Sequence, residues 1–198
     1  MTEVIVGADG QARCFWAARE PETTYHDTEW GFPTTGDAAL FERVCLEGFQ
    51  SGLSWRTILT KRENFRAAFA GFDIEAVARF GADDVARLLA DAGIVRHRGK
   101  IEATINNAAR AVELIEAEGS LDEYFWRYAP GPDHVPGSMT TSPESVALSK
   151  DLKRRGWRFV GPTTVFAMMQ ATGMVNDHAA DCVIRDRVAA ALAGKLTR

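Results

Sequence analysis

Apolar side chains recur at helical spacing from about Asp37 to near the C-terminus of this 198-residue chain. In the stretch "GKIEATINNAARAVELIEAEG", residues 99–119, one helical stripe contains Ile101, Ile105, Ala108, Ala109, Val112 and Ile115. Alternation of apolar and polar residues, which would predict strands, is limited to the short candidate "WRFVG" at residues 157–161. The sequence therefore predicts an all-α protein with about eight to ten short helices.

Residues that cap or break helices give the expected helix ends. Asp37 is a plausible N-cap for a helix whose apolar face includes Cys45, so we expect this cysteine in the core. The next helix would begin near Ser54 and end near Gly71, and Asp73 would begin a shorter one.

Three further segments complete the expected layout. Residues 1–36 are rich in Pro, Thr and Gly, so we expect an irregular segment that needs a contact elsewhere to hold it in place. The stretch "GPDHVPGSMTTSP" at residues 131–143 predicts a loop. A last helix is expected over residues 178–194, "HAADCVIRDRVAAALAG".

His178 and Cys182 are four residues apart, a spacing that puts two side chains on one face of a helix. Cys14 and His26 lie in the irregular N-terminal segment, and the four residues together have the composition of a closed tetrahedral zinc site. Such a site would join the two ends of the chain, and four protein ligands would make it structural rather than catalytic. The alternative is a buried thiol beside ordinary histidines.

A second informative stretch is "LLADAGIVRHRGKIEATI", residues 88–105, in which two helical patterns meet at a turn with Gly93 and Gly99. The basic or titratable residues of this turn are Arg96, His97, Arg98 and Lys100. A glycine-bearing hairpin followed by a helix N-terminus offers backbone N–H groups to phosphate, as in a helix–hairpin–helix element. The alternative is a solvated turn, and the net charge of −4 argues mildly against a nucleic-acid partner.

A second basic run, "SKDLKRRGWR" at residues 149–158, contains Lys150, Lys153, Arg154, Arg155 and Arg158. This run is either another contact with DNA or simply the exposed face of a helix. Two separate basic patches in an acidic chain strengthen the expectation of DNA binding.

Glu47 lies within "CLEGFQSGLSW", among apolar residues and near a concentration of aromatic residues. Its carboxylate faces either solvent or a cavity, and composition alone favours solvent. In a cavity it would accept hydrogen bonds from a nucleobase, while Trp16 and Trp55 would offer stacking surfaces.

Longer motifs decide among these alternatives. They are "YHDTEWG" at 25–31, "LEGFQSGLSWRTILTKRENFRAAF" at 46–69, "DAGIVRHRGKIEATINNA" at 91–108, and "VNDH" at 175–178 followed by Cys182. From about Cys14 to Cys182 the chain resembles the 3-methyladenine DNA glycosylase I family. The resemblance implies an all-α, helix–hairpin–helix DNA glycosylase fold with a zinc site joining the N- and C-terminal segments. It also implies excision of 3-methyladenine from alkylated double-stranded DNA.

The resemblance further implies a role for individual residues. One structural zinc ion per chain would be held by Cys14, His26, His178 and Cys182. The catalytic residues, which would also hydrogen-bond the methylated base, are Glu47 and Tyr25. The base would stack on Trp55, and another wall would be Trp16. Phosphate would be held by the hairpin residues Gly93, Arg96, Arg98, Gly99 and Lys100. The gap left by the flipped base would be probed by Gln50, Gly52 and Leu53.

We expect one unit of two helical lobes. The helical body would span residues 37–165 with the hairpin at 88–101, and the zinc-bound lobe would combine residues 1–36 and 166–198. Sparse cysteines, with no signal peptide or membrane span, predict a cytosolic protein, which we expect to be a monomer. Water would hydrolyse the glycosidic bond without a lyase step, and no side chain is assigned as general base. The alternatives are a zinc-stapled DNA-binding module without chemistry and a metal-dependent hydrolase.

Overall fold

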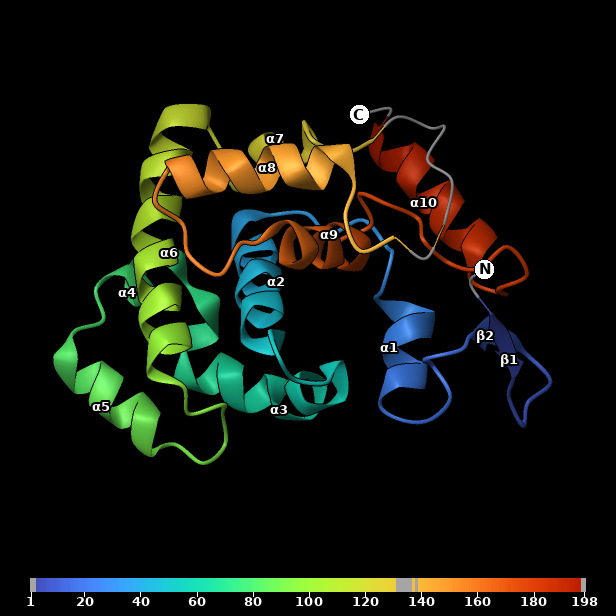
Figure 1. The fold of residues 1–198 in the computed structure, drawn as a ribbon, viewed down its shortest axis with the longest axis horizontal. Helices are drawn as coiled ribbons and strands as arrows, with labels where there is room; N and C mark the ends of the chain where they lie inside the picture. The colour runs from blue at the N-terminus through green and yellow to red at the C-terminus, as the bar shows by residue number, and fades with distance from the viewer. Residues whose placement is uncertain (1–2, 131–136, 138, 197–198) are drawn as a thin grey trace.

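The computed structural model describes residues 3–130, 137 and 139–196, and helices dominate this part of the chain (Figure 1). Its α-helices are α1 (Glu22–Thr28), α2 (Asp37–Gln50), α3 (Trp55–Ala68), α4 (Ile74–Ala78), α5 (Ala82–Ala90), α6 (Arg98–Glu118), α7 (Leu121–Trp126), α8 (Pro143–Arg154), α9 (Pro162–Ala171) and α10 (Arg185–Leu196). A short 3-10 helix, η1 (Ala70–Phe72), follows α3, and the strands β1 (Val4–Val6) and β2 (Ala12–Cys14) form an antiparallel hairpin. Within the described residues, no helix combines the length and apolar character that a bilayer crossing requires.

The larger core surrounds α2, which contacts α3, α6, α7 and α9. Phenylalanines form much of this core, and the contacting rings are Phe41, Phe49, Phe65, Phe69 and Phe72. Full burial of a side chain of this kind contributes about 1.5–3 kcal/mol. The second half of α2 is therefore held from several sides, and its polar side chains have fixed positions.

A smaller core joins both ends of the described chain. Its buried members are Cys14, Ala179, Cys182, Ile184 and Val188. A 2.9 Å backbone hydrogen bond from the N–H of Val183 to the carbonyl of Ala12 adds a direct link. Figure 1 shows the N-terminal hairpin beside the start of α10, at the opposite end of the molecule from α5.

The structure corrects both terminal segments. Residues 1–36 are not wholly irregular, because they contain β1, β2 and α1. The helix expected over 178–194 is wrong in its first part, since α10 begins only at Arg185. The N–H groups before it bond outside a helix, that of His178 to Asn176 Oδ1 and that of Val183 to Ala12. The side chains of His178 and Cys182 therefore approach through a folded loop rather than a helical turn.

The expected caps are partly confirmed. Asp73 caps α4, and its carboxylate accepts a 2.7 Å hydrogen bond from the N–H of Ala76. Asp37 is not an N-cap but the first residue of α2. Its carboxylate instead accepts hydrogen bonds from the N–H groups of Leu121 and Asp122 at the start of α7. Tertiary packing thus uses Asp37 to cap a different helix.

The buried stripe of α6 is wider than expected. Ile101 and Ala108 are buried, but Ile105, Val112 and Ile115 are only partly buried. The other buried positions are Lys100, Ala103, Thr104, Asn107, Ala111 and Leu114. Polar positions are included because α6 contacts α2 and α4 and also supplies side chains to a neighbouring loop.

Three smaller expectations have plain outcomes. Cys45 is buried in the larger core, as expected. Residues 157–161 form no strand and connect α8 to α9. Of the loop expected at 131–143, residues 131–136 and 138 lie outside the described residues, and Pro143 already begins α8.

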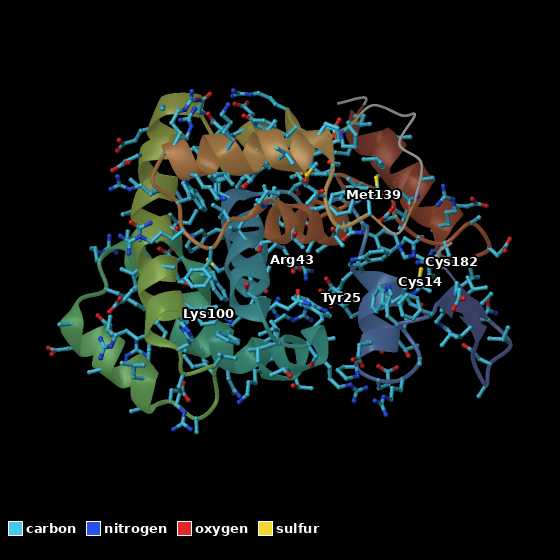
Figure 2. All side chains as sticks on the ribbon, viewed as in Figure 1. Cys14, Tyr25, Arg43, Lys100, Met139 and Cys182 are labelled. Atoms are coloured by element: carbon cyan, nitrogen blue, oxygen red, sulfur yellow. The ribbon has the colours of Figure 1, made fainter. Side chains whose placement is uncertain are left out.

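A buried lysine links the first turn of α6 to the end of α2. Lys100 is 7% exposed, and its Nζ donates to the carbonyls of Phe49 (2.8 Å) and Ser51 (2.6 Å). Its place between α6 and α2 is visible in Figure 2. Carbonyls in the last turn of a helix have no partner within the helix, and a cation there is also favoured by the helix dipole. Lys100 therefore fixes the loop that follows α2.

We expect Lys100→Met to lower the free energy of unfolding by about 2 kcal/mol, because two carbonyls lose a charged donor. Urea denaturation at constant pH measures this change. The matched control is Arg98→Met, which removes an exposed charge from the same helical turn and should change stability by less than about 0.5 kcal/mol. Equal stability of Lys100→Met and the wild-type chain would contradict the structural role.

Candidate active site and metal centre

A cavity of about 560 Å³ opens where the terminal segments meet α2, α3 and α9. The four side chains that the sequence assigns to base binding all line it: Trp16, Tyr25, Glu47 and Trp55. Small-molecule sites are typically about 300–1,000 Å³, with mostly apolar walls and a few placed polar groups. The cavity therefore has the size and lining of a ligand site.

Glu47 is a buried acidic group of this cavity. The residue lies in the second half of α2 and is 6% exposed, so the interpretation that it faces solvent is wrong. Burial raises the pKa of Glu47 to about 8, against the opposing effect of the positive charge of Arg43. A buried carboxyl with a strongly perturbed pKa in a cavity indicates a functional site.

Tyr25, on α1, is buried beside Glu47 in the same cavity. Arg43 Nη1 donates to the phenol oxygen at 3.3 Å, and its guanidinium lies over the Tyr25 ring, 5.4 Å from the centroid. Figure 2 shows Tyr25 and Arg43 in the region between α1 and α2. Burial raises the pKa of Tyr25, so the phenol keeps its proton. Because its oxygen accepts from Arg43, the hydroxyl proton remains available to a second partner.

Glu29 neutralises the arginines behind Tyr25. Its Oε2 accepts from Arg43 Nη2 at 2.8 Å and from Arg62 Nη1 at 2.6 Å. Burial acts to raise the pKa of Glu29, but Arg62 and Arg43 outweigh it and lower the pKa. Since Arg43 is already paired with Glu29, the Glu47 carboxyl remains available to a cationic ligand.

Aromatic rings form the walls of the cavity. Trp55 lies at the start of α3, and its ring centroid is 5.3 Å from that of Tyr25. The ring centroids of Trp16 and Trp30 are 5.1 Å apart. Such faces stack on flat rings and attract cations. Sequence reasoning did not assign Trp30 to the cavity, although "YHDTEWG" contains it.

Two polar residues of the cavity were also missed. Gln170 on α9 donates from Nε2 to Asp177 Oδ2 at 2.6 Å, and both residues line the cavity. Asp177 also accepts from the N–H of Gly137 at 3.2 Å. The signal in the sequence was the "VNDH" motif, in which Asp177 precedes the metal-ligand candidate His178.

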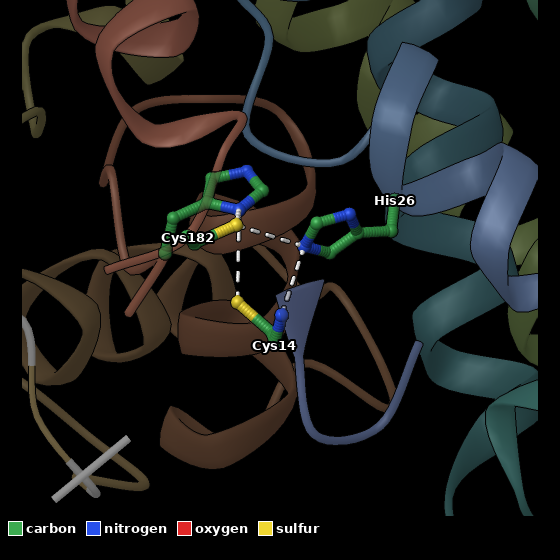
Figure 3. Close-up of side chains that lie close together, drawn as sticks. Cys14, His26 and Cys182 are labelled. Carbon is green, nitrogen blue, oxygen red and sulfur yellow. Dashed lines mark hydrogen bonds between the residues drawn. The ribbon is translucent and has the colours of Figure 1, made fainter. Parts of the chain in front are cut away.

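The four residues predicted from the sequence to bind a metal meet in one buried cluster. Figure 3 labels three of them, Cys14, His26 and Cys182. Cys182 Sγ lies 3.4 Å from His26 Nε2 and 3.4 Å from His178 Nδ1, and Cys14 Sγ lies 3.7 Å from His178 Nδ1. Bonds of about 2.3 Å to sulfur and about 2.0–2.1 Å to nitrogen place tetrahedral S and N ligands about 3.5 Å apart. Contacts with Cys14 and both histidines lower the pKa of Cys182 and favour a thiolate. The cluster therefore could bind a metal ion.

Hydrogen bonds outside the cluster orient both histidines. His26 Nδ1 lies 2.7 Å from Asp27 Oδ1, and His178 Nε2 lies 3.1 Å from the carbonyl of Trp30. Arg13 Nε in turn donates to Asp27 Oδ2 at 2.9 Å. Partners of this kind fix the tautomer, so that the nitrogen facing the cluster carries a lone pair.

The residues assigned to DNA lie in two connections between helices and at the helix ends that flank them. In the hairpin between α5 and α6, Arg96 and Arg98 are exposed, while Gly93 donates from its N–H to Asp91 Oδ1 at 2.7 Å. Gly99 lies in the first turn of α6. Lys100 differs from the expectation, because its ammonium is bound to carbonyls of the protein.

The second loop joins α2 to α3 at the cavity. Gln50 lines the cavity, and Leu53 is an exposed apolar residue. Gly52 has a φ of +79°, a left-handed conformation that glycine adopts most readily. The turn therefore presents Leu53 at the surface next to the cavity mouth.

A buried carboxyl beside aromatic rings is suited to a flat, hydrogen-bonding ring, and exposed arginines on a hairpin are suited to a polyanion. These features together are those expected of a helical protein that binds a nucleobase. The sequence profile of the methyladenine glycosylase family matches residues 16–186, and the chain belongs to this family. The family consists of enzymes that hydrolyse N-glycosyl bonds. The resemblance noted in the sequence motifs is thereby confirmed.

The alignments with similar proteins cover nearly the whole length of each of those proteins. DNA-3-methyladenine glycosylase 1 of Escherichia coli is 46% identical over 177 residues, which cover 86% of this chain and 95% of that protein. DNA-3-methyladenine glycosylase of Haemophilus influenzae is 41% identical over 177 residues, which cover 86% of this chain and 96% of that protein. A solved structure of 3-methyladenine DNA glycosylase I from Staphylococcus aureus superposes with a TM-score of 0.83 and is 37% identical in sequence. The superposition covers 87% of this chain and 96% of the Staphylococcus aureus chain.

Glu47→Gln should change the pH dependence of stability. The pKa of Glu47 is about 8 in the folded chain against a usual value of 4.5. Between these two pH values the folded chain keeps the carboxyl proton, and the unfolded chain releases it. This contribution to stability is fully present below about pH 4.5 and is lost as the pH rises through about 8. The stability of Glu47→Gln relative to wild type should therefore increase between about pH 5 and about pH 8, by a few kcal/mol at most. Urea denaturation at both pH values tests this, and an unchanged difference would contradict the burial of an acidic group.

Proposed function

We propose that this chain hydrolyses the N-glycosidic bond of 3-methyladenine in alkylated double-stranded DNA, after the nucleotide is flipped out of the duplex. The observation that carries the proposal is the buried Glu47 beside Tyr25 in an aromatic cavity. Relatives named as 3-methyladenine glycosylases support it, as does a similar solved structure that contains 3-methyladenine. The chain acts on DNA as a cytosolic monomer.

Recognition depends on the charge of the damaged base. A methyl group on N3 makes adenine cationic while the ring is still bonded to deoxyribose. A cation beside Glu47 lowers the pKa of this carboxyl, so binding the lesion converts a neutral acid into a carboxylate. The faces of Trp16 and Trp55 also attract a cationic ring. Unmodified adenine is neutral and produces neither effect, so the cavity favours the methylated base.

Bond cleavage needs little acid catalysis because the cationic base is a good leaving group. Tyr25 donates a hydrogen bond to the base and Glu47 accepts one, which fixes the ring as the C–N bond breaks. The electron pair of that bond passes to the base, which leaves as neutral 3-methyladenine. The Glu47 charge favours the developing oxocarbenium ion, to which water adds before losing a proton to solvent. No amine attacks the sugar, so the reaction is monofunctional.

The two loops would contact the duplex in different ways. We infer that α5, the turn at 91–97 and α6 form a helix–hairpin–helix element, in which Arg96 and Arg98 flank a phosphate held by backbone N–H groups near Gly93 and Gly99. The loop of Gln50, Gly52 and Leu53 would enter the gap left by the flipped nucleotide, since it lies beside the cavity. Lys100 would position this loop rather than bind phosphate.

We also propose that the Cys14, His26, His178 and Cys182 cluster holds one structural zinc ion. Two thiolates and two imidazoles at these separations suit tetrahedral zinc. The ion would join β2 and α1 to the loop before α10, and all four of its ligands come from the protein. The chemistry of the cavity does not pass through it.

Glu47→Gln should reduce the release of 3-methyladenine at least about 100-fold, because the amide cannot ionise when the cationic base binds. Single-turnover reactions on methylated duplex DNA, with chromatographic identification of the released base, measure this rate. The matched control is Glu42→Gln, the same change on the same helix at a residue that pairs with Arg66 at 2.8 Å. It should retain close to the wild-type rate.

Other outcomes would change the assignment. A wild-type rate in Glu47→Gln would remove this residue from the mechanism. Wild-type protein that binds methylated DNA but releases no base would support a DNA-binding module without chemistry. A borohydride-stable adduct with DNA would show a lysine–sugar Schiff base and would overturn the monofunctional reaction.

Cys182→Ser should abolish stoichiometric zinc and lower the melting temperature by several degrees, because a structural ion contributes directly to folding. Elemental analysis and thermal denaturation of the purified chain measure both effects. Cys45→Ser is the matched control, since Cys45 is buried away from the cluster. It should lose stability without losing zinc, and a Cys182→Ser chain that retains the full zinc content would contradict the site.

A further inference from the structure

The loop between α8 and α9 presents an arginine and a phenylalanine that the site described above does not use. Arg158 and Phe159 follow the end of the basic run at 149–158 and are both exposed. Within the described residues, Arg154 and Arg155 of that run pair with Asp151, whereas no ion pair is found for Arg158. The Arg158 guanidinium is therefore available to an external anion.

Phe159 has a backbone conformation that its side chain does not favour. Its φ is +54°, in the left-handed region where a residue with a Cβ is strained. Phe72 has a similar φ of +58°, but its ring is fully buried in the larger core. Phe159 is 39% exposed, so burial of its ring offsets the backbone strain less than burial does for Phe72. Strain of this kind in an exposed residue points to a functional contact.

The fold holds this loop firmly. Asn107 on α6 is buried, and its amide bonds both backbone groups of Arg158, accepting from the N–H at 2.8 Å and donating to the carbonyl at 2.9 Å. Ser149 Oγ donates to the carbonyl of Val160 at 2.6 Å. Figure 1 shows the loop running along α6 toward α2. The exposed pair is thus presented by a rigid backbone.

The loop also lies beside the hairpin and beside the end of α2, from which the loop of Gln50, Gly52 and Leu53 continues. The ring centroid of Phe159 is 6.3 Å from that of His97, the hairpin residue that caps the N-terminus of α6. A Cβ on Gly48 would lie 3.5 Å from the Cβ of Phe159, so the loop packs on the last turns of α2. Phe159, and Arg158 next to it in the chain, therefore lie close to the hairpin and to the last turns of α2.

We propose that Arg158 and Phe159 form a further contact with the sugar–phosphate backbone of duplex DNA, with the guanidinium on a phosphate and the ring against an adjacent deoxyribose. The proposal rests on the proposed function, because it assigns the same DNA as ligand. Arginine suits phosphate through charge-assisted hydrogen bonds, and an aromatic ring adds apolar contact without reading sequence. A contact of this kind is independent of where the damage lies in a sequence.

The test measures the dissociation constant of an unmethylated duplex with one uncleavable abasic-site analogue at several salt concentrations. Arg158→Gln should weaken binding and reduce the slope of log K against log salt by about 1, because one phosphate contact is lost. Arg154→Gln, the matched control, should leave the slope unchanged. Phe159→Gly should weaken binding about 3- to 10-fold at an unchanged slope. Its melting temperature should be at least that of wild type, because glycine relieves the strain.

The outcomes separate this contact from the proposed function. Wild-type affinity and slope in Arg158→Gln, with excision of 3-methyladenine intact in the wild-type chain, would overturn the contact alone. Failure of the wild-type chain to release any base would overturn the proposed function, while a reduced slope in Arg158→Gln would still support the contact. A fall in the melting temperature of Phe159→Gly at unchanged affinity would show that the ring has only a packing role.

Discussion

The cavity depends on a contact between the two ends of the described chain. Cys14 and His178 are 164 positions apart in the sequence, yet their ligand atoms lie 3.7 Å apart in a buried cluster. Closing so long a loop costs conformational entropy. One cysteine or histidine side chain alone contributes too little to offset this cost, so the contact depends on the cluster as a whole. Trp16, Trp30 and Asp177 each lie within a few residues of a cluster member and line the cavity. A chain without this contact would lose one whole side of the cavity while keeping the larger core.

The other side of the cavity is set by α2 and by an unequal distribution of charge. Glu29 pairs with both Arg43 and Arg62, so the positive charge behind Tyr25 is already neutralised. Glu47 is left with a raised pKa, because burial acts on it without a paired cation. Burying an acid in this way opposes stability, and in the proposed reaction a cationic ring at this point would restore the carboxylate. Under the proposed function, the charge of the ligand would therefore complete the site.

Sequence reasoning succeeded where residue type alone is specific. The four members of the buried cluster were found because cysteine and histidine are few in this chain, and most helices were found because their apolar period is strong. It failed where a tertiary partner decides the outcome. Asp37 caps α7 instead of its own helix, and His178 and Cys182 approach through a loop whose N–H groups bond elsewhere. Local composition could not orient Glu47, because every residue from Arg43 to Phe49 of α2 is buried and no solvent face exists there.

The elements proposed to contact DNA share one support, the helix α6. His97 caps its first turn, Lys100 bonds the carbonyls at the end of α2, and Asn107 bonds the backbone of Arg158. Lys100 and Asn107 are two turns apart, about 10 Å along a helix. The hairpin, the loop after α2 and the loop after α8 are therefore held at fixed separations by the protein itself. Preorganisation lowers the ordering cost of association, which leaves more of the binding free energy to offset the few kcal/mol needed to unstack a base. A duplex would then meet a rigid face, so the DNA rather than the protein has to change shape.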